Sequence, residues 1–161
     1  MGSKDTKGTK DTKGTKGTKG TKAATDVPTS RMRIPSPLSA DLEALTYEVI
    51  GAGFAVHTRL GPGLPEAVYR DALQVELSGR GHAVTTELPA ATSYRKALLR
   101  RHRLDLVVDD QLIVEAKSAA KLLSVHSAQL VAYLRATGLR VGLLMNFGEE
   151  HLRNGIRRHI L

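Results

Sequence analysis

The sequence predicts an α/β fold in which helices flank a small mixed β-sheet. Three observations lead to this fold class. Apolar residues in 39–60 recur at spacings of three and four, as on the buried face of a helix. Short runs rich in Val, Ile and Leu at 102–108, 111–116 and 140–146 are typical of strands. The predicted order is helix, helix, three strands, helix, strand, helix, which suggests layers of helix packed around one sheet.

The first predicted helix begins after Ser39, a plausible N-cap, and ends at Gly61-Pro62-Gly63. Its apolar positions are Leu42, Leu45, Val49, Ala52 and Val56. The second helix should start near Pro65, because proline is favoured in the first turn, and stop at Gly79-Arg80-Gly81. Its inward positions are expected to be Val68, Ala72, Leu73 and Leu77.

Three strands are predicted next, at 83–88, 102–108 and 111–116. The last two are separated only by Asp109-Asp110-Gln111, which predicts a hairpin.

The C-terminal part should hold a helix, a strand and a helix. The helix runs from about Val125 to Ala136 and is ended by Gly138. Residues 140–146 follow as a buried strand, and 149–159 are expected to form a last short helix.

The length of 161 residues fits one domain with a tail. Residues 1–38 are expected to be a disordered Lys/Thr/Gly-rich basic tail and a proline-containing linker, and residues 39–161 the domain. Of the net charge of +8, +5 lies on residues 1–22. This tail would act either as a polycation that adds nonspecific affinity for phosphate or as a solubilising segment.

Composition excludes several classes of protein. There is no cysteine, which rules out disulfides and thiolate metal sites. No apolar run approaches the ~20 residues of a membrane helix, and the N-terminus lacks the apolar segment of a secretory signal. We therefore expect a soluble, cytoplasmic protein with no membrane partner.

Two acids and a lysine stand on the predicted hairpin. Asp105 follows the start of one apolar run, and Glu115 and Lys117 end the next. A hairpin would bring all three together, and such a set can hold a divalent metal and position a water on phosphate. The alternative is that Asp105 is a turn residue and that Glu115 and Lys117 form a solvent-facing pair.

Two helices add polar groups to this set. In the later helix, His126, Gln129 and Tyr133 form a polar stripe, whereas the opposite side, with Val125, Leu130 and Ala132, is more apolar. In the second helix, Glu66 and Tyr69 stand three apart. The stripe could orient a phosphate or a lysine, or simply border the core. A first-turn glutamate is also favoured by the helix dipole alone.

The run LGPGLPEAVYRDAL (60–73) resembles the signature of the GxxExxY protein family, with Gly63, Glu66 and Tyr69 at the named positions. The segments RLDLVVDDQLIVEAK, HSAQLVAYL and GLLMNFG are similar to the same family in order and spacing. That family is grouped with the PD-(D/E)XK nuclease superfamily, so the resemblance implies a restriction-endonuclease-like core. It covers about residues 42–158.

The resemblance also implies roles for individual residues. Asp105 and Glu115 would be the metal-binding carboxylates, and Lys117 would be the catalytic lysine. Because oxygen ligands select hard cations, the ion would be Mg²⁺ or Mn²⁺, and the carbonyl of Ala116, between the two motif residues, would be a further ligand. Glu66 would be an additional acid, supported by Gln129 and Tyr133. The proline that precedes the first acid in the superfamily's name is replaced here by Leu104.

The function that follows is a metal-dependent nuclease that acts on DNA or RNA phosphodiesters. The alternatives are a nucleic-acid-binding or regulatory module that does not cleave, and a subunit of a larger assembly or a homodimer. A basic cluster would be either a phosphate-binding rim or a solvated loop. Its members are Arg95, Lys96, Arg100, Arg101 and Arg103.

Overall fold

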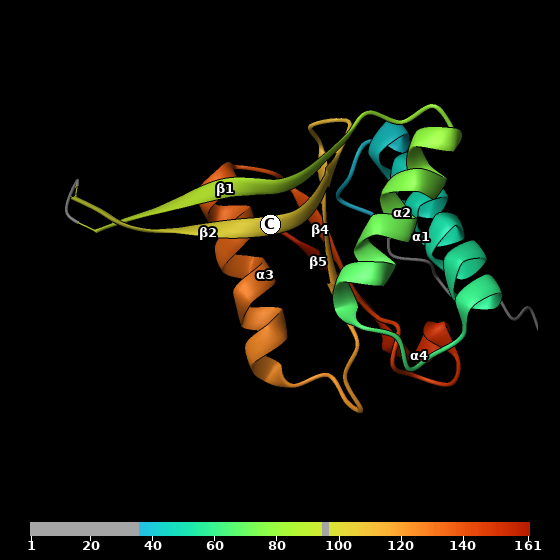
Figure 1. The fold of residues 1–161 in the computed structure, drawn as a ribbon. Coiled ribbons are helices and arrows are strands. Elements are labelled where there is room, and N and C mark those ends of the chain that lie inside the picture. Colours follow the sequence, from blue (N-terminus) through green and yellow to red (C-terminus); the bar gives the residue numbers. More distant parts are fainter. Residues whose placement is uncertain (1–35, 95–96) are drawn as a thin grey trace, which may run out of the picture. The chain divides into compact units, whose positions relative to one another are not determined.

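A five-stranded sheet in the order β1-β2-β3-β4-β5 forms the centre of the fold (Figure 1). The computed structural model describes residues 36–94 and 97–161, and within that range only the backbone of 90–94 and 97–102. The elements are α1 (Ala40–Leu60), α2 (Glu66–Gly79), β1 (Val84–Tyr94), β2 (Ala97–Val108), β3 (Leu112–Lys117), α3 (Ser124–Thr137), β4 (Val141–Asn146), α4 (Leu152–Gly155) and β5 (Ile156–Ile160).

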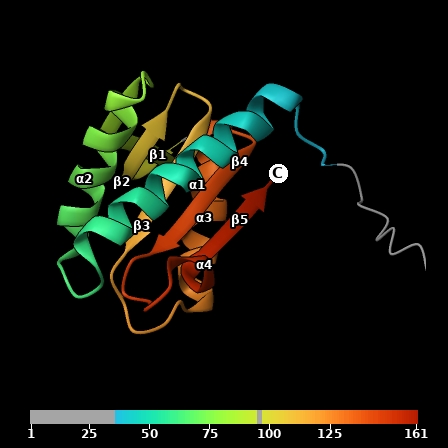
Figure 2. The same ribbon diagram turned by 90° about the vertical axis from the view of Figure 1, so that its right-hand side faces the viewer.

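The sheet is mixed, because β3 and β4 run parallel while the other neighbouring strands are antiparallel. Helices α1 and α2 cover one face and α3 covers the other (Figures 1 and 2). The core is accordingly divided into two clusters, one between the sheet and α1/α2 and a smaller one under α3. The predicted α/β fold with a small mixed sheet flanked by helices is confirmed.

Helix α1 follows the sequence prediction closely. The Ser39 hydroxyl accepts a hydrogen bond from the amide of Leu42 at 3.3 Å, as expected of an N-cap. The apolar stripe faces the core, where Val49 and Ala52 are fully buried. Gly53 lets the helix approach β4, because a Cβ there would stand 2.9 Å from the sulfur of Met145.

Two predictions about helix faces are wrong. On α2, Val68 is 40% exposed, and Tyr69 takes the inward place beside Leu73 and Leu77. On α3, Val125 and Ala132 are exposed and the buried residues are Leu130, Tyr133 and Leu134. The buried face of α3 therefore includes the end of the predicted polar stripe.

The predicted last helix at 149–159 is also wrong. Only Leu152–Gly155 is helical, and Ile156–Ile160 pairs with β4 as an antiparallel edge strand. Ile156, Arg158 and Ile160 share one face of β5, where the two isoleucines pack against the larger core cluster and Arg158 contacts the Glu43 carboxylate of α1 at 2.9 Å. Successive residues of a strand point to opposite faces, and His159 accordingly lies on the other face, where its Nε2 contacts the Ser127 hydroxyl of α3 at 3.1 Å.

The predicted β2–β3 hairpin is present. Asp109 and Asp110 both have positive φ, 50° and 56°, as a type I′ turn requires, and the amide of Gln111 donates to Val108 O at 2.9 Å. His82 holds this turn through a 2.7 Å contact from Nδ1 to Asp109. The bond to Asp109 and a second contact with Glu48 raise the pKa of His82.

Strands β1 and β2 extend further than 83–88 and 102–108, up to Tyr94 and from Ala97. The expected tail lies almost wholly outside the described residues. Among the described helices, none is long and apolar enough to span a bilayer.

Candidate active site

The two predicted acids lie where the β2–β3 ladder ends. Paired residues run from Val108↔Leu112 to Leu106↔Val114, so Asp105 and Glu115 are the next residues on the two strands. The next amide of β3, that of Ala116, donates to the Asp105 carboxylate at 2.9 Å and not to a backbone carbonyl of β2. The hairpin thus brings Asp105 and Glu115 to the same end of the strand pair, as the sequence predicts.

The ladder between β2 and its other neighbour, β1, is also irregular beside Asp105. In the β1–β2 ladder, Thr86 pairs with Leu106 and Leu88 with Leu104, but Glu87 and Asp105 between them do not pair. Glu87 has a φ of 51°, a left-handed conformation that is strained for a residue with a side chain. Strand β2 is therefore released from both ladders at the position of its acid.

Lys117 connects the strand end to helix α2. Its Nζ donates to Glu115 Oε1 at 2.9 Å, to Ala116 O at 2.9 Å and to Glu66 Oε1 at 3.1 Å. An ammonium group has three N–H donors, so these three acceptors use all of them. Side-chain exposure is 13% for Lys117 and 4% for Glu115, but 45% for Glu66. The Glu66 contact is thus the solvent-facing member of the set.

Burial dominates the electrostatics of the two acids. It raises the pKa of Glu115 to about 7, helped by the nearby charge of Asp105 and opposed by Lys117. Burial also raises the pKa of Asp105, against the influence of Lys117 and the Ala116 amide. For Lys117, burial acts to lower the pKa, but the surrounding carboxylates outweigh it and raise the pKa. The lysine therefore stays charged, whereas Lys117 and the nearby hydrogen bonds only partly offset the cost of burying the two charged acids.

The charged cluster consists of Glu66, Asp105, Glu115 and Lys117, and one of its carboxylate oxygens has no hydrogen-bond partner among the described residues. Oε2 of Glu115 is buried and makes no hydrogen bond among the described residues. A buried anionic oxygen without a partner is costly, and a cation would satisfy it. The described residues contain no group of three or more His, Asp or Glu side chains arranged for a metal ion. A metal here would depend on Asp105, Glu115, a backbone carbonyl and water, a donor set that suits Mg²⁺ or Mn²⁺.

Two of the predicted residues of α3 face this cluster. The Gln129 side-chain amide donates to the Tyr133 hydroxyl at 2.6 Å, and Tyr133 is 5% exposed. Burial raises the pKa of Tyr133, and the charges of Glu115 and Asp105 raise it further, so the phenol lies within their field. His126 instead accepts the amide of Leu123 at 3.3 Å at the start of the helix, a structural role.

The three residues of the GxxExxY motif have distinct places. Gly63 has a φ of 101°, a conformation that favours glycine. Glu66 contacts Lys117, as described above. Tyr69 is fully buried, and its hydroxyl donates to Gly61 O at 2.6 Å and accepts the amide of Leu64 at 3.0 Å. Tyr69 thus fixes the loop that leads to Glu66 rather than joining the charged cluster.

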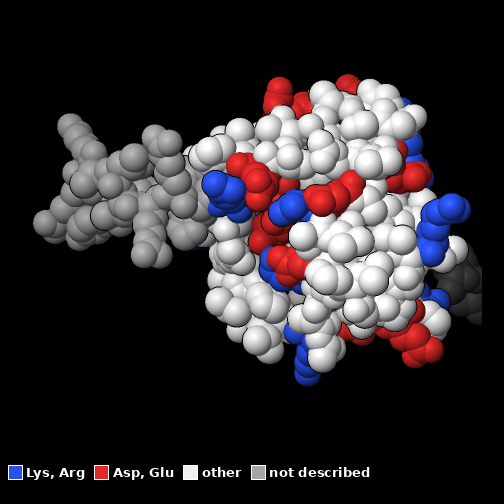
Figure 3. All heavy atoms as spheres, in the orientation of Figure 1, with Lys and Arg blue, Asp and Glu red and all other residues white. Residues whose placement is uncertain are grey.

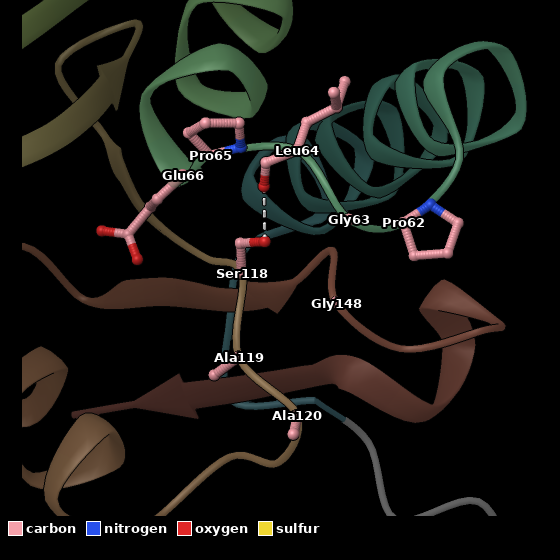
Figure 4. A pocket seen from close by; sticks show the side chains of 9 residues that line it. All are labelled: Pro62, Gly63, Leu64, Pro65, Glu66, Ser118, Ala119, Ala120 and Gly148. Carbon is pink, nitrogen blue, oxygen red and sulfur yellow. Dashed lines mark hydrogen bonds between the residues drawn. The ribbon is translucent and has the colours of Figure 1, made fainter.

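A pocket of about 580 Å³ lies beside Glu66, between the α1–α2 loop and the loops that follow β3 and β4 (Figure 4). The Ser118 hydroxyl donates to Leu64 O at 2.7 Å and ties two of these loops together. The pocket is lined by Pro62, Gly63, Leu64, Pro65, Glu66, Ser118, Ala119, Ala120 and Gly148. Glu66 therefore borders both this pocket and the charged cluster.

Sequence reasoning missed two charged residues of this region. Arg70 lies one turn after Glu66 on α2, and its Nη1 is 3.5 Å from Oε1 of Glu87. The other Glu87 oxygen is 3.3 Å from Arg103. Acidic and basic side chains gather in the middle of this face of the molecule (Figure 3). The i,i+4 spacing from Glu66 could have indicated Arg70, but Glu87 left no signal in the sequence.

The predicted basic rim is described only in part. Arg103 is 71% exposed and pairs with Glu87. Arg95 and Lys96 lie outside the described residues, and the side chains of Arg100 and Arg101 are not described. The rim therefore stays a prediction.

In a comparison with protein-family models, the chain matches the model described as PD-(D/E)XK nuclease superfamily over residues 43–159. This range runs from α1 to β5 and includes each residue of the charged cluster. No curated protein and no solved structure matches the chain.

Proposed function

The chain belongs to the PD-(D/E)XK nuclease superfamily, and on this premise we propose that it is a metal-dependent nuclease that hydrolyses phosphodiester bonds of DNA or RNA. Within the superfamily we assign it to the GxxExxY family on its motif Gly63, Glu66 and Tyr69. The observation that carries the proposal is the buried Glu115 oxygen beside Asp105 and Lys117 that has no hydrogen-bond partner in the described part of the chain. A buried pair of acids with one lysine is a destabilising arrangement that metal binding would relieve.

In this proposal Asp105 and Glu115 hold Mg²⁺ or Mn²⁺, with the carbonyl of Ala116 as a further ligand. When bound, such an ion activates a water and offsets negative charge on the phosphate. The Ala116 carbonyl has a second lone pair for this purpose, because Lys117 uses only one.

Lys117 would orient the attacking water or stabilise charge on the phosphate in the transition state. All three of its donors are used by protein acceptors, so it must exchange one of them for the substrate. Glu66 is the acceptor at the longest distance and the most exposed of the three. We expect Glu66 to release Lys117 when substrate binds, while Gln129 and Tyr133 support the cluster from α3.

Purified protein incubated with labelled single-stranded and duplex DNA and RNA tests the proposal. We expect cleavage with Mg²⁺ or Mn²⁺, and loss of cleavage in EDTA, in Lys117→Ala and in Asp105→Asn. Lys121→Ala and Asp110→Asn are matched controls, because both residues are exposed and lie outside the cluster. These two should cleave at the wild-type rate.

Thermal melting gives a second, independent readout. Mn²⁺ should raise the melting temperature of the wild type and of Asp110→Asn, but not that of Asp105→Asn, because only bound ligand stabilises the folded state. Cleavage that persists in EDTA or in Lys117→Ala would contradict the mechanism. Binding of nucleic acid without turnover on any substrate would favour the non-cleaving module instead.

A further inference from the structure

We propose that Arg70 binds a phosphate of the substrate backbone next to the metal-binding carboxylates. This inference rests on the proposed nuclease function and adds a residue to its site. Neither the motif nor the superfamily match assigns a role to Arg70.

Position on the helix is the first argument. Arg70 and Glu66 are four residues apart on α2 and so lie on the same helix face, one turn from each other. Glu66 contacts Lys117 at 3.1 Å. Nη1 of Arg70 lies 3.5 Å from Glu87, the β1 residue that stands opposite Asp105 of β2. The face of α2 that is directed toward the end of the β2–β3 ladder thus carries Glu66 and, one helical turn later, the guanidinium of Arg70.

The donors of Arg70 are the second argument. Nε and Nη2 both donate to Oδ1 of Asp71, at 3.0 and 2.9 Å, and Nη1 lies 3.5 Å from Glu87. A guanidinium has five N–H groups, so several remain without a hydrogen bond among the described residues. The side chain is only 22% exposed, which means that it is held in place rather than extended into solvent. A fixed guanidinium with free N–H groups is suited to a phosphate.

The surrounding acids explain why an arginine would be needed here. The acids of this region outnumber its cations, and the excess negative charge gives a field that would repel a polyanion. The acids are Glu66, Asp71, Glu87, Asp105 and Glu115, and the cations are Arg70, Arg103 and Lys117. A metal ion would offset part of that field at Asp105, and Arg70 would offset it one helical turn away. Asp71 and Glu87 then serve to hold the guanidinium in position.

The test uses Arg70→Gln and, as a matched control, Arg80→Gln. Arg80 is the C-cap residue of α2, at the opposite end of the helix from Glu66. Its side chain is 33% exposed and also donates through Nε and Nη2 to one carboxylate oxygen, that of Glu76. It lies about 15 Å along the axis from Arg70, so both variants lose the same charge but only one loses it at the site.

Binding of a fluorescein-labelled oligonucleotide is measured by anisotropy at several salt concentrations, in Ca²⁺ and in EDTA. Losing one phosphate contact should reduce the slope of log K against log salt by about 1 and weaken binding about tenfold. Arg80→Gln should keep the wild-type slope. Arg70→Lys should keep the slope as well, because it retains the charge, but bind less tightly than the wild type.

The outcomes separate the two proposals. If the wild type binds and Arg70→Gln has the slope of Arg80→Gln, the role of Arg70 is wrong and the nuclease proposal stands. If the wild type binds no oligonucleotide in either condition, the nuclease proposal fails and this inference with it. Melting temperatures of both variants show whether a loss of affinity is due to unfolding.

Discussion

Removing the hydroxyl of Tyr69 should destabilise the fold, because this single group makes two hydrogen bonds to the α1–α2 loop. In Tyr69→Phe the ring keeps its stacking on Phe147, where the centroids are 4.6 Å apart and the planes 10° from parallel. What is lost is the bond to Gly61 O at 2.6 Å and the bond from the Leu64 amide at 3.0 Å. Each lost partner costs about 1 kcal/mol, and leaving both backbone groups unpaired gives a total of about 1–3 kcal/mol.

Thermal melting followed by circular dichroism measures this loss. At roughly 4 °C per kcal/mol for a domain of this size, the midpoint should fall by about 4–12 °C. Tyr47→Phe is the matched control, because Tyr47 is 68% exposed on α1 and its loss should stay within about 0.5 kcal/mol. Equal midpoints for the two variants would show that the Tyr69 hydroxyl does not hold the loop, and the structural account of the motif would be wrong.

Three further changes test the electrostatics and packing. Because the pKa of Glu115 is raised from 4.5 to about 7, its share of stability is complete below pH 4.5 and is lost as the pH rises through 7. In EDTA, the melting temperature of Glu115→Gln should therefore fall less than that of the wild type as the pH rises from 4.5 through 7. The pKa of His82 is raised above 6.5, so its stabilising contribution is present below pH 6.5 and disappears at higher pH. In the same melts, the wild type should therefore have a higher melting temperature than His82→Gln below pH 6.5, and this difference should disappear at higher pH. Gly148→Ala should destabilise by about 1–3 kcal/mol in urea unfolding, since the new Cβ would meet Ala119 O at 2.4 Å. Gly79→Ala, with open space around it, should not destabilise.

Features that depend on neighbouring residues in the chain were predictable. The N-cap Ser39 and the Asp109-Asp110 turn act within a few residues, so composition and spacing indicate them. The acids Asp105 and Glu115 belong to this class too, because a hairpin joins them.

Features that depend on remote partners were not predictable. Strand β5 exists because β4 offers an edge, and its five residues alone do not favour a strand over a short helix. Tyr69 is buried in place of Val68 because the α1–α2 loop provides partners for its hydroxyl. Arg70 and Glu87 come together only after α2 packs beside β1, so spacing could not have paired them.

The irregular backbone around Asp105 is better explained by function than by folding. Strand β2 leaves both ladders at this position, and Glu87 takes a strained φ. The adjacent Glu115 is buried, and one of its oxygens makes no hydrogen bond to any residue that the structure describes. Apolar residues at 105 and 115 would continue the ladders and would add stability, because burying charge is costly even when the charge is paired. Three destabilising features at one strand end are the arrangement expected where a cation and a phosphate are to be bound. We expect Glu115→Gln to raise the melting temperature at neutral pH. If these three features served stability alone, the same substitution would lower it.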